Sequence, residues 1–187
     1  GEQQVKPTPD VQTFLPKDYK MPTTERQARA YPDAPYWQAP EPMEKVSLLE
    51  TDTFSYMSRQ ELPGGCNVVR TKTVYDVKTN PDGSIDKYKC RLVAKGFSQS
   101  EGTDYEDTFA PVSQLLSMRM LLSHALAENL TLHHLDVSTA FLASPIDPRF
   151  NIYVELPDSF AGPNGEKFAK LNNSLYGLKQ AAHDWFQ

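Results

Sequence analysis

Residues 68–93 read VVRTKTVYDVKTNPDGSIDKYKCRLV, and their pattern predicts the clearest local structure of the chain. Residues 68–77 and 88–93 are rich in valine, threonine, tyrosine and other residues that favour β-strands. Between them, residues 80–83 read Asn-Pro-Asp-Gly, a strong turn signal because proline fixes φ and glycine accepts a positive φ. The sequence therefore predicts a β-hairpin.

The predicted hairpin is basic, although the chain is acidic. Residues 70–100 have a local charge balance of +4, whereas the 187-residue chain has a net charge of −5, which leaves −9 for the remainder. The acidic total argues against a general nucleic-acid coat protein, because neutralising phosphates requires an excess of Lys and Arg. The hairpin is either a basic finger or an exposed loop with solvated lysines. Its seven basic residues are Arg70, Lys72, Lys78, Lys87, Lys89, Arg91 and Lys95.

Downstream of the hairpin, the hydrophobic pattern changes to a helical period. Residues 113–129 place apolar side chains on one helical face, with Ser113 as the N-cap. Residues 130–137 then predict a buried strand, residues 152–156 predict another short strand, and residues 171–186 include a helix. Together these elements indicate an α+β fold.

The N-terminal third is rich in proline. Residues 1–35 are polar with little periodicity, which predicts a flexible or clinging arm. From residue 36 apolar residues return at helical spacing, so we expect one or two short helices broken by Pro40 and Pro42. We therefore expect an arm at residues 1–35 and a folded domain over residues 36–187.

The cysteines and the hydropathy bear on the compartment. Cys66 and Cys90 form no CxxC pair and have no histidine at zinc-ligand spacing, so we expect two reduced thiols in an intracellular protein. No apolar run approaches the roughly 20 residues of a membrane span. The first residues, GEQQVKPTPD, have neither a basic start nor the apolar core of a secretory signal.

One carboxylate stands out inside the predicted strand at residues 130–137. Asp136 lies between Leu135 and Val137, and a carboxylate in an apolar strand is costly to bury unless it is paired or binds a cation. Taken alone, it is more simply interpreted as a strand-end aspartate that caps a backbone N–H. The adjacent His133 and His134 would point to opposite faces of a strand, so we expect strand residues rather than metal ligands there.

Five ordered blocks of sequence support a more specific interpretation. They are YKCRLVAKGFSQ at residues 88–99, GTDYEDTFAPV at 102–112, LDVSTAFL at 135–142, IYV at 152–154 and LYGLKQA at 175–181. In these blocks the chain resembles the copia-type retrotransposon reverse transcriptases, which are RNA-directed DNA polymerases. The resemblance covers residues 68–187, with a weaker match from Trp37, and implies a fingers β-hairpin followed by an incomplete palm.

The resemblance implies roles for several residues. Asp136 matches the first catalytic aspartate, which holds the two divalent ions of nucleotidyl transfer, and the carbonyl of Val137 would help to hold one ion. Phe141 matches an aromatic gate that rejects a ribose 2′ hydroxyl, although an aromatic after a strand is more commonly a core residue. Lys78 and Arg91 match residues that clamp the incoming triphosphate.

The last block implies contacts with nucleic acid. Gly177, Lys179 and Gln180 match the segment that packs against the nascent base pair and the template. The partners implied by the family are a primer–template of RNA or DNA and deoxynucleoside triphosphates.

The chain also departs from the family pattern. The family usually has lysine where Ser138 stands, Pro-Arg where Ala182-His183 stand, and a glycine near Ser144. The second acidic cluster of the family, Tyr-x-Asp-Asp, does not occur in the sequence. We therefore expect Mg²⁺ to bind only if a complete palm is present, and we expect this polypeptide alone not to polymerise. The alternative is a truncated retroelement-derived domain that serves as a structural or interaction subunit with a protein partner.

Overall fold

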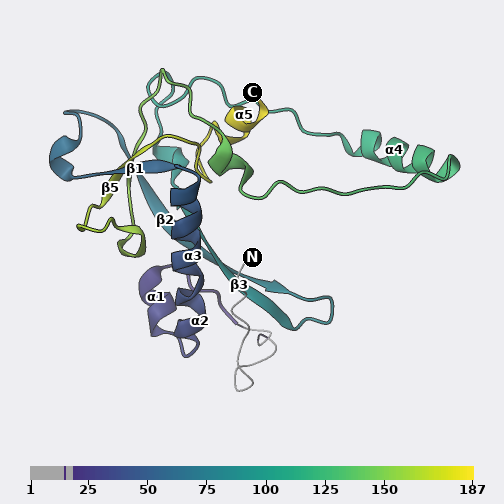
Figure 1. The fold of residues 1–187 in the computed structure, drawn as a ribbon, viewed down its shortest axis with the longest axis horizontal. Coiled ribbons are helices and arrows are strands. Elements are labelled where there is room, and N and C mark those ends of the chain that lie inside the picture. Colours follow the sequence, from purple (N-terminus) through teal and green to yellow (C-terminus); the bar gives the residue numbers. More distant parts are fainter. Residues whose placement is uncertain (1–14, 16–18) are drawn as a thin grey trace.

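The hairpin predicted from residues 68–93 forms one edge of the sheet and extends beyond the other strands (Figure 1). The structure is a computed structural model that describes residue 15 and residues 19–187. Strand β2 (Val68–Thr79) pairs antiparallel with β3 (Ile85–Ala94), with Lys78 opposite Lys87 and an irregularity after Lys78. Gly83 in the turn has a φ of +84°, as the turn sequence requires. The predicted hairpin is confirmed.

The hairpin belongs to a five-stranded sheet with the order β1-β5-β4-β2-β3. Strand β4 (Tyr153–Glu155) runs parallel to β2 and confirms the strand predicted at residues 152–156. The strands β1 (Phe54–Met57) and β5 (Phe168–Leu171) complete the sheet with antiparallel pairing. The mixture of helices with this sheet agrees with the α+β prediction.

Three N-terminal helices cover one face of the hairpin: α1 (Glu25–Ala30), α2 (Ala34–Gln38) and α3 (Pro40–Glu50). The indole of Trp37 is fully buried, with the Tyr88 ring centroid at 4.6 Å and the Tyr75 ring centroid at 5.8 Å.

The predicted break at Pro40 is confirmed, because α2 ends at Gln38 and α3 begins at Pro40, whereas Pro42 breaks no helix. Pro40 is the first residue of α3 and Pro42 lies in its first turn, where a backbone N–H has no intrahelical partner to lose. Of the arm predicted at residues 1–35, residues 1–14 and 16–18 lie outside the described residues. The prediction is wrong for residues 25–30, because they form α1 with Thr24 as a side-chain N-cap and Ala28 fully buried. The boundary of a domain at residue 36 remains a prediction.

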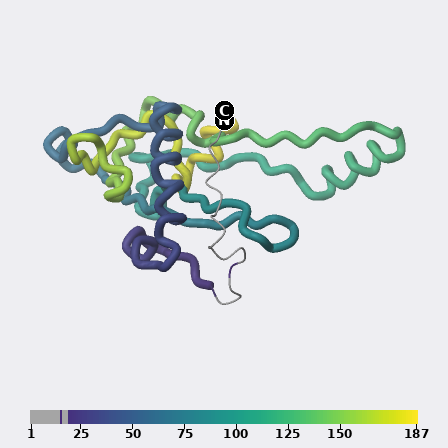
Figure 2. The backbone as a smooth tube through the Cα atoms, turned by 60° about the horizontal axis from the view of Figure 1, so that its bottom comes forward, coloured from purple at the N-terminus to yellow at the C-terminus, as the bar shows by residue number. Residues whose placement is uncertain are grey.

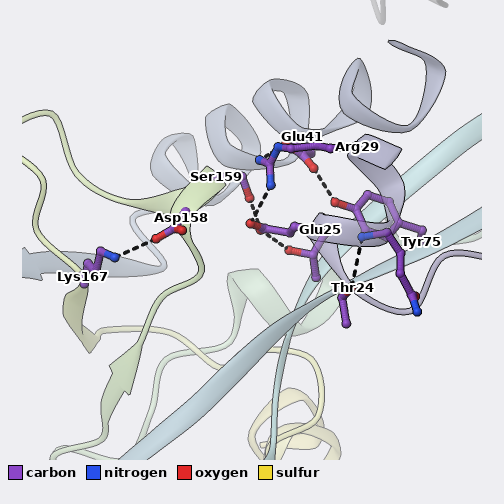
Figure 3. Close-up of polar contacts among 10 residues, drawn as sticks. Thr24, Glu25, Arg29, Glu41, Tyr75, Asp158, Ser159 and Lys167 are labelled. Atoms are coloured by element: carbon purple, nitrogen blue, oxygen red, sulfur yellow. Dashed lines mark hydrogen bonds and ion pairs between the residues drawn. The ribbon is translucent and has the colours of Figure 1, made fainter. Parts of the chain in front are cut away.

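A partly buried polar network joins these helices to the hairpin (Figure 3). The Glu25 carboxylate accepts hydrogen bonds from Thr73 of β2, at 2.8 Å, and from Ser159. Arg29 pairs with Glu25 at 3.2 Å and with Glu41 at 3.5 Å. The Tyr75 hydroxyl also donates to Glu41. Burial raises the pKa of Glu41, and the Tyr75 hydrogen bond and the Arg29 charge offset part of that rise.

Residues 113–138 project away from the sheet (Figures 1 and 2). We call this segment the α4 projection, after helix α4 (Leu115–Ala127), which confirms the helix predicted at residues 113–129. Ser113 is not its N-cap, because Gln114 occupies that position without a side-chain hydrogen bond. Only Ala125 is buried within the α4 projection.

The strand predicted at residues 130–137 is wrong. These residues form no strand and are all exposed, with Leu135 at 88% exposure. A β-strand requires a neighbour for its N–H and C=O groups, and no described strand pairs with this segment.

The C-terminal helix, the cysteines and the possibility of a membrane span were also addressed by the sequence. The helix predicted within residues 171–186 is confirmed as α5 (Ala181–Phe186). Cys66 and Cys90 are free thiols, as expected. Among the described residues, no helix has both the length and the apolar composition needed to cross a membrane.

Tyr75→Phe removes the hydroxyl that donates to the buried Glu41 carboxylate. We expect the free energy of unfolding to fall by about 1–3 kcal/mol, because the acceptor keeps its desolvation cost without the hydrogen bond. Urea denaturation measures this change. Tyr153→Phe is the matched control, since Tyr153 is also buried but its hydroxyl bonds to no described residue. Equal losses in the two variants would contradict the role of the network.

Candidate nucleic-acid interface

One face of the β2–β3 hairpin gathers its basic side chains. Side chains alternate between the two faces along each strand, and directly paired residues share a face. The pairs Lys78–Lys87 and Val74–Arg91 therefore place five basic residues together, with Asp76 as the acidic residue among them. We call this set the basic face: Lys72, Lys78, Lys87, Lys89 and Arg91.

The opposite face of the hairpin lies against the helices. It contains Thr73, Tyr75, Cys90 and Leu92, all of them buried. The hairpin is thus amphipathic, and the helices α1–α3 leave the basic face uncovered.

The cations of the basic face repel one another. The pKa of Lys89 is lowered, first by partial burial and then by the charges of Arg91, Lys78 and Lys87. Glu44 of α3 opposes this shift, and it also accepts a hydrogen bond from the edge N–H of Leu92 at 3.4 Å. A bound anion would relieve the remaining repulsion.

Arg91 lies in a cluster with two aromatic rings. Its guanidinium carbon is 5.9 Å from the centroid of the Tyr176 ring. The half-buried Phe141 ring meets the same tyrosine edge-on, with 5.8 Å between the centroids. Two of the sequence-predicted site residues, Arg91 and Phe141, are therefore brought together by Tyr176. Tyr176 was missed as a site residue, although it lies within the quoted LYGLKQA block.

Lys78 lies on the same face as Arg91 but not opposite it. The register pairs Arg91 with Val74 and Lys78 with Lys87, so the two cations are about 13 Å apart along the hairpin. Lys89 lies between them on the same face.

The segment 175–180, which we call the glycine turn, lies against the base of the hairpin. The Ala94 N–H donates to the Tyr176 carbonyl at 2.7 Å. A Cβ on Gly177, whose φ is +86°, would overlap the Ala94 carbonyl oxygen and would lie 2.7 Å from Val93 Cγ1. A Cβ on Gly96 would overlap the Gly177 carbonyl oxygen. Two backbones meet here without room for a side chain.

The two residues after Gly177 in the predicted site differ in exposure. Lys179 is exposed, and its ammonium contacts the Tyr105 hydroxyl at 3.0 Å. Gln180 is only 3% exposed, and its amide bonds to Gln99 and to the Asp104 carbonyl. The Gln180 side chain therefore does not reach the surface.

Asp136 and Val137 lie in the exposed, unpaired segment of the α4 projection. Within the described part of the chain, no group of three or more His, Cys, Asp or Glu side chains is arranged to hold a metal ion. Two divalent ions require several anionic oxygen ligands, so a single exposed carboxylate does not fit a two-metal site.

A pocket of about 230 Å³ lies beside α5. Its lining includes the carboxylates of Glu106, Asp107, Asp147 and Asp184. Arg149 pairs with Glu106 at 2.8 Å and with Asp147 at 2.7 Å. The excess of carboxylates makes this pocket unsuited to phosphate, unlike the basic face.

Most of the chain is similar in sequence to a known protein family and to several known proteins. Residues 55–187 match the family described as "Reverse transcriptase (RNA-dependent DNA polymerase)". The chain is 35% identical over 180 residues to the retrovirus-related Pol polyprotein from transposon TNT 1-94 of Nicotiana tabacum, covering 95% of this chain and 13% of that protein. It is 37% identical over 125 residues to the Pol polyprotein from transposon RE1 of Arabidopsis thaliana, covering 66% of this chain and 8% of that protein.

A yeast relative is more distant. The transposon Ty1-DR4 Gag-Pol polyprotein of Saccharomyces cerevisiae is 30% identical over 136 residues, covering 73% of this chain and 8% of that protein. The chain thus spans 13% or less of the length of each of these relatives. No solved structure matches the chain significantly.

Three alanine substitutions separate backbone strain from close approach. Gly102→Ala introduces only the strain of a φ of +79°, since no described atom lies within 4 Å of the added Cβ, and we expect the free energy of unfolding to fall by about 1–2 kcal/mol. Gly96→Ala introduces only overlap with the Gly177 carbonyl oxygen, and we expect the free energy of unfolding to fall by about 1–3 kcal/mol. Gly177→Ala introduces both, so we expect the largest loss of unfolding free energy by urea denaturation. A Gly177→Ala loss no greater than that of Gly102→Ala would contradict the close approach.

Proposed function

The chain belongs to the reverse transcriptase family, and we propose that it supplies the primer–template and nucleotide contacts of a copia-type RNA-directed DNA polymerase. The observation that supports this proposal most directly is the basic face of the hairpin, which continues into the Arg91–Tyr176–Phe141 cluster. The activity of the whole polymerase depends on much more protein than these residues.

The charge distribution favours a polyanionic ligand. In a chain with a net charge of −5, the five cations of the basic face are concentrated on one side of one hairpin. Partial burial and then the repulsion of neighbouring cations lower the pKa of Lys89, and phosphates placed among these cations would offset the repulsion. A local positive field of this kind also increases the rate of encounter with nucleic acid.

The row of Lys78, Lys89 and Arg91 suits a triphosphate. Arg91 can bind two phosphate oxygens at once, and its position next to Tyr176 limits its motion. With a triphosphate along this row, the sugar would lie toward the Phe141 ring. In this arrangement the ring excludes a 2′ hydroxyl, which makes deoxynucleotides the preferred substrates.

Asp136 and the Val137 carbonyl are the groups that this chain would contribute to the Mg²⁺ ions implied by the family. Since a single carboxylate does not fit two ions, we derive no metal-dependent step from these residues, and polymerisation requires further acidic ligands.

The basic face can be tested by the salt dependence of binding. Lys78→Met, Lys89→Met and Arg91→Met should each weaken binding to a labelled primer–template duplex, measured by fluorescence anisotropy. Each lost phosphate contact should reduce the slope of log K against log salt by about 0.9. Lys167→Met is the control, because Lys167 precedes β5 and pairs with Asp158 at 2.8 Å. Salt-independent binding by the unmodified chain, or an equal effect of Lys167→Met, would sink the proposal.

Lys89→Met should also separate stability from binding. Because folding lowers the pKa of Lys89, its charged form destabilises the folded chain at neutral pH, and methionine removes that cost. We expect a stability gain of at most ~0.5 kcal/mol, since Lys89 is only half-buried and solvent screens its charge. Thermal denaturation measures the gain. If stability and duplex binding fall together, Lys89 has a structural role instead.

A further inference from the structure

The loop of residues 96–105 lies against the glycine turn through a chain of side-chain amides. The Lys179 N–H donates to Gln99 Oε1 at 2.9 Å. Gln99 Nε2 donates to Gln180 Oε1 at 3.0 Å, and Gln180 Nε2 donates to the Asp104 carbonyl at 3.2 Å. Gln99 and Gln180 are both at least 95% buried.

The direction of every hydrogen bond in this chain is fixed by its two ends. A backbone N–H can only donate, so Gln99 must present its oxygen to Lys179 and its nitrogen to Gln180. A backbone carbonyl can only accept, so Gln180 must present its nitrogen to Asp104. Neither amide can flip without placing like groups together, and the pair therefore has one arrangement.

Asp104 anchors the far end of the chain. It is 2% exposed, and its carboxylate accepts from Asn67 Nδ2 at 2.6 Å and from the Ser100 N–H at 2.8 Å. These bonds hold the loop in a defined shape, so the position of the Asp104 carbonyl is set independently of the glycine turn.

The element that this arrangement fixes in place is Lys179. Its ammonium lies 3.0 Å from the Tyr105 hydroxyl, 3.2 Å from the Gln99 carbonyl and 4.8 Å from the Tyr105 ring centroid. An ammonium has three N–H groups, and these two hydrogen bonds use two of them. The third is left for a ligand, and Lys179 is exposed.

We propose that Gln99, Gln180 and Tyr105 are positioning residues that hold the Lys179 ammonium for a phosphate of the bound nucleic acid. This inference rests on the proposed function of the basic face. The family resemblance predicts that Gln180 touches the template, but in this proposal it acts through Lys179. Lys179 follows Tyr176 by three positions in the sequence, and the Tyr176 ring contacts Arg91. The glycine turn thus adds one aligned cation to those of the hairpin.

The test is a double-mutant cycle on the full 187-residue chain. Gln180→Glu keeps the shape and the acceptor for Gln99, but at pH 8 it places a carboxylate oxygen against the Asp104 carbonyl. Lys179→Met removes the ammonium. We expect each single variant to reduce the salt slope of duplex binding by about 0.9, the value for one phosphate contact. The double variant should reduce the salt slope of duplex binding by no more than either single variant does.

A purely structural role predicts different results. Gln180→Glu would then lower the melting temperature but leave the salt slope of the folded chain unchanged, and its effect would add to that of Lys179→Met. The positioning role further predicts that the binding deficit of Gln180→Glu, relative to the unmodified chain at the same pH, narrows toward pH 5.5. A protonated glutamate can again donate to the Asp104 carbonyl. A deficit that does not change with pH would overturn the proposal.

A second measurement needs no nucleic acid. Acetylation of lysines, followed by mass spectrometry of peptides, should be several-fold slower at Lys179 than at the exposed Lys20. Tyr105→Phe removes one contact of the ammonium without disturbing the amide pair, and Gln180→Glu removes its alignment. Both should accelerate acetylation at Lys179 only. Unchanged acetylation rates would overturn the positioning role, whereas unchanged duplex affinity and salt slope in the hairpin variants would overturn the proposed function instead.

Discussion

A single contact between two backbones, at Ala94 and the glycine turn, determines how the candidate interface is assembled. The Ala94 N–H donates to the Tyr176 carbonyl at 2.7 Å, and the absence of a Cβ on Gly177 allows the approach. Because residues 94 and 176 are far apart in the sequence, this contact brings the end of the hairpin to the C-terminal segment. Tyr176 then lies beside Arg91, and Phe141 packs on Tyr176. This approach therefore gives the basic face its contact with the Tyr176 ring.

The second constraint is the division of the hairpin into two faces. The helices α1–α3 bury one face around Trp37, and the network of Glu25, Arg29, Glu41 and Tyr75 fixes their position. Buried carboxylates are tolerated there because donors surround them. The helices therefore do more than cover a core, since their location leaves Lys72 and Lys78 of the other face exposed and Lys87, Lys89 and Arg91 partly exposed.

The α4 projection is packed differently from the hairpin and its helices. Its helix is apolar on most sides, which is typical of a helix that is buried on several sides, yet nearly all of its side chains are exposed. Among the described residues only Ala125 of this segment is buried, so the segment with Asp136 makes little contact with the hairpin unit. The proposed nucleic-acid contacts and the proposed metal ligand thus belong to two parts of the chain that differ in packing.

Elements with local causes could be predicted from the amino-acid sequence alone. The Asn-Pro-Asp-Gly turn, the helical period of residues 115–127 and the charge of residues 70–100 each depend on neighbours within a few positions. The family resemblance predicted roles for Arg91 and Phe141, but neither their contacts with Tyr176 nor the burial of Gln180 has a local signal in the sequence. The strand predicted at residues 130–137 was wrong for the same reason, because an apolar run forms a strand only where a partner strand lies beside it. Tertiary structure decided these points, since close backbone approach and hydrogen bonding between distant residues depend on where the whole chain brings them.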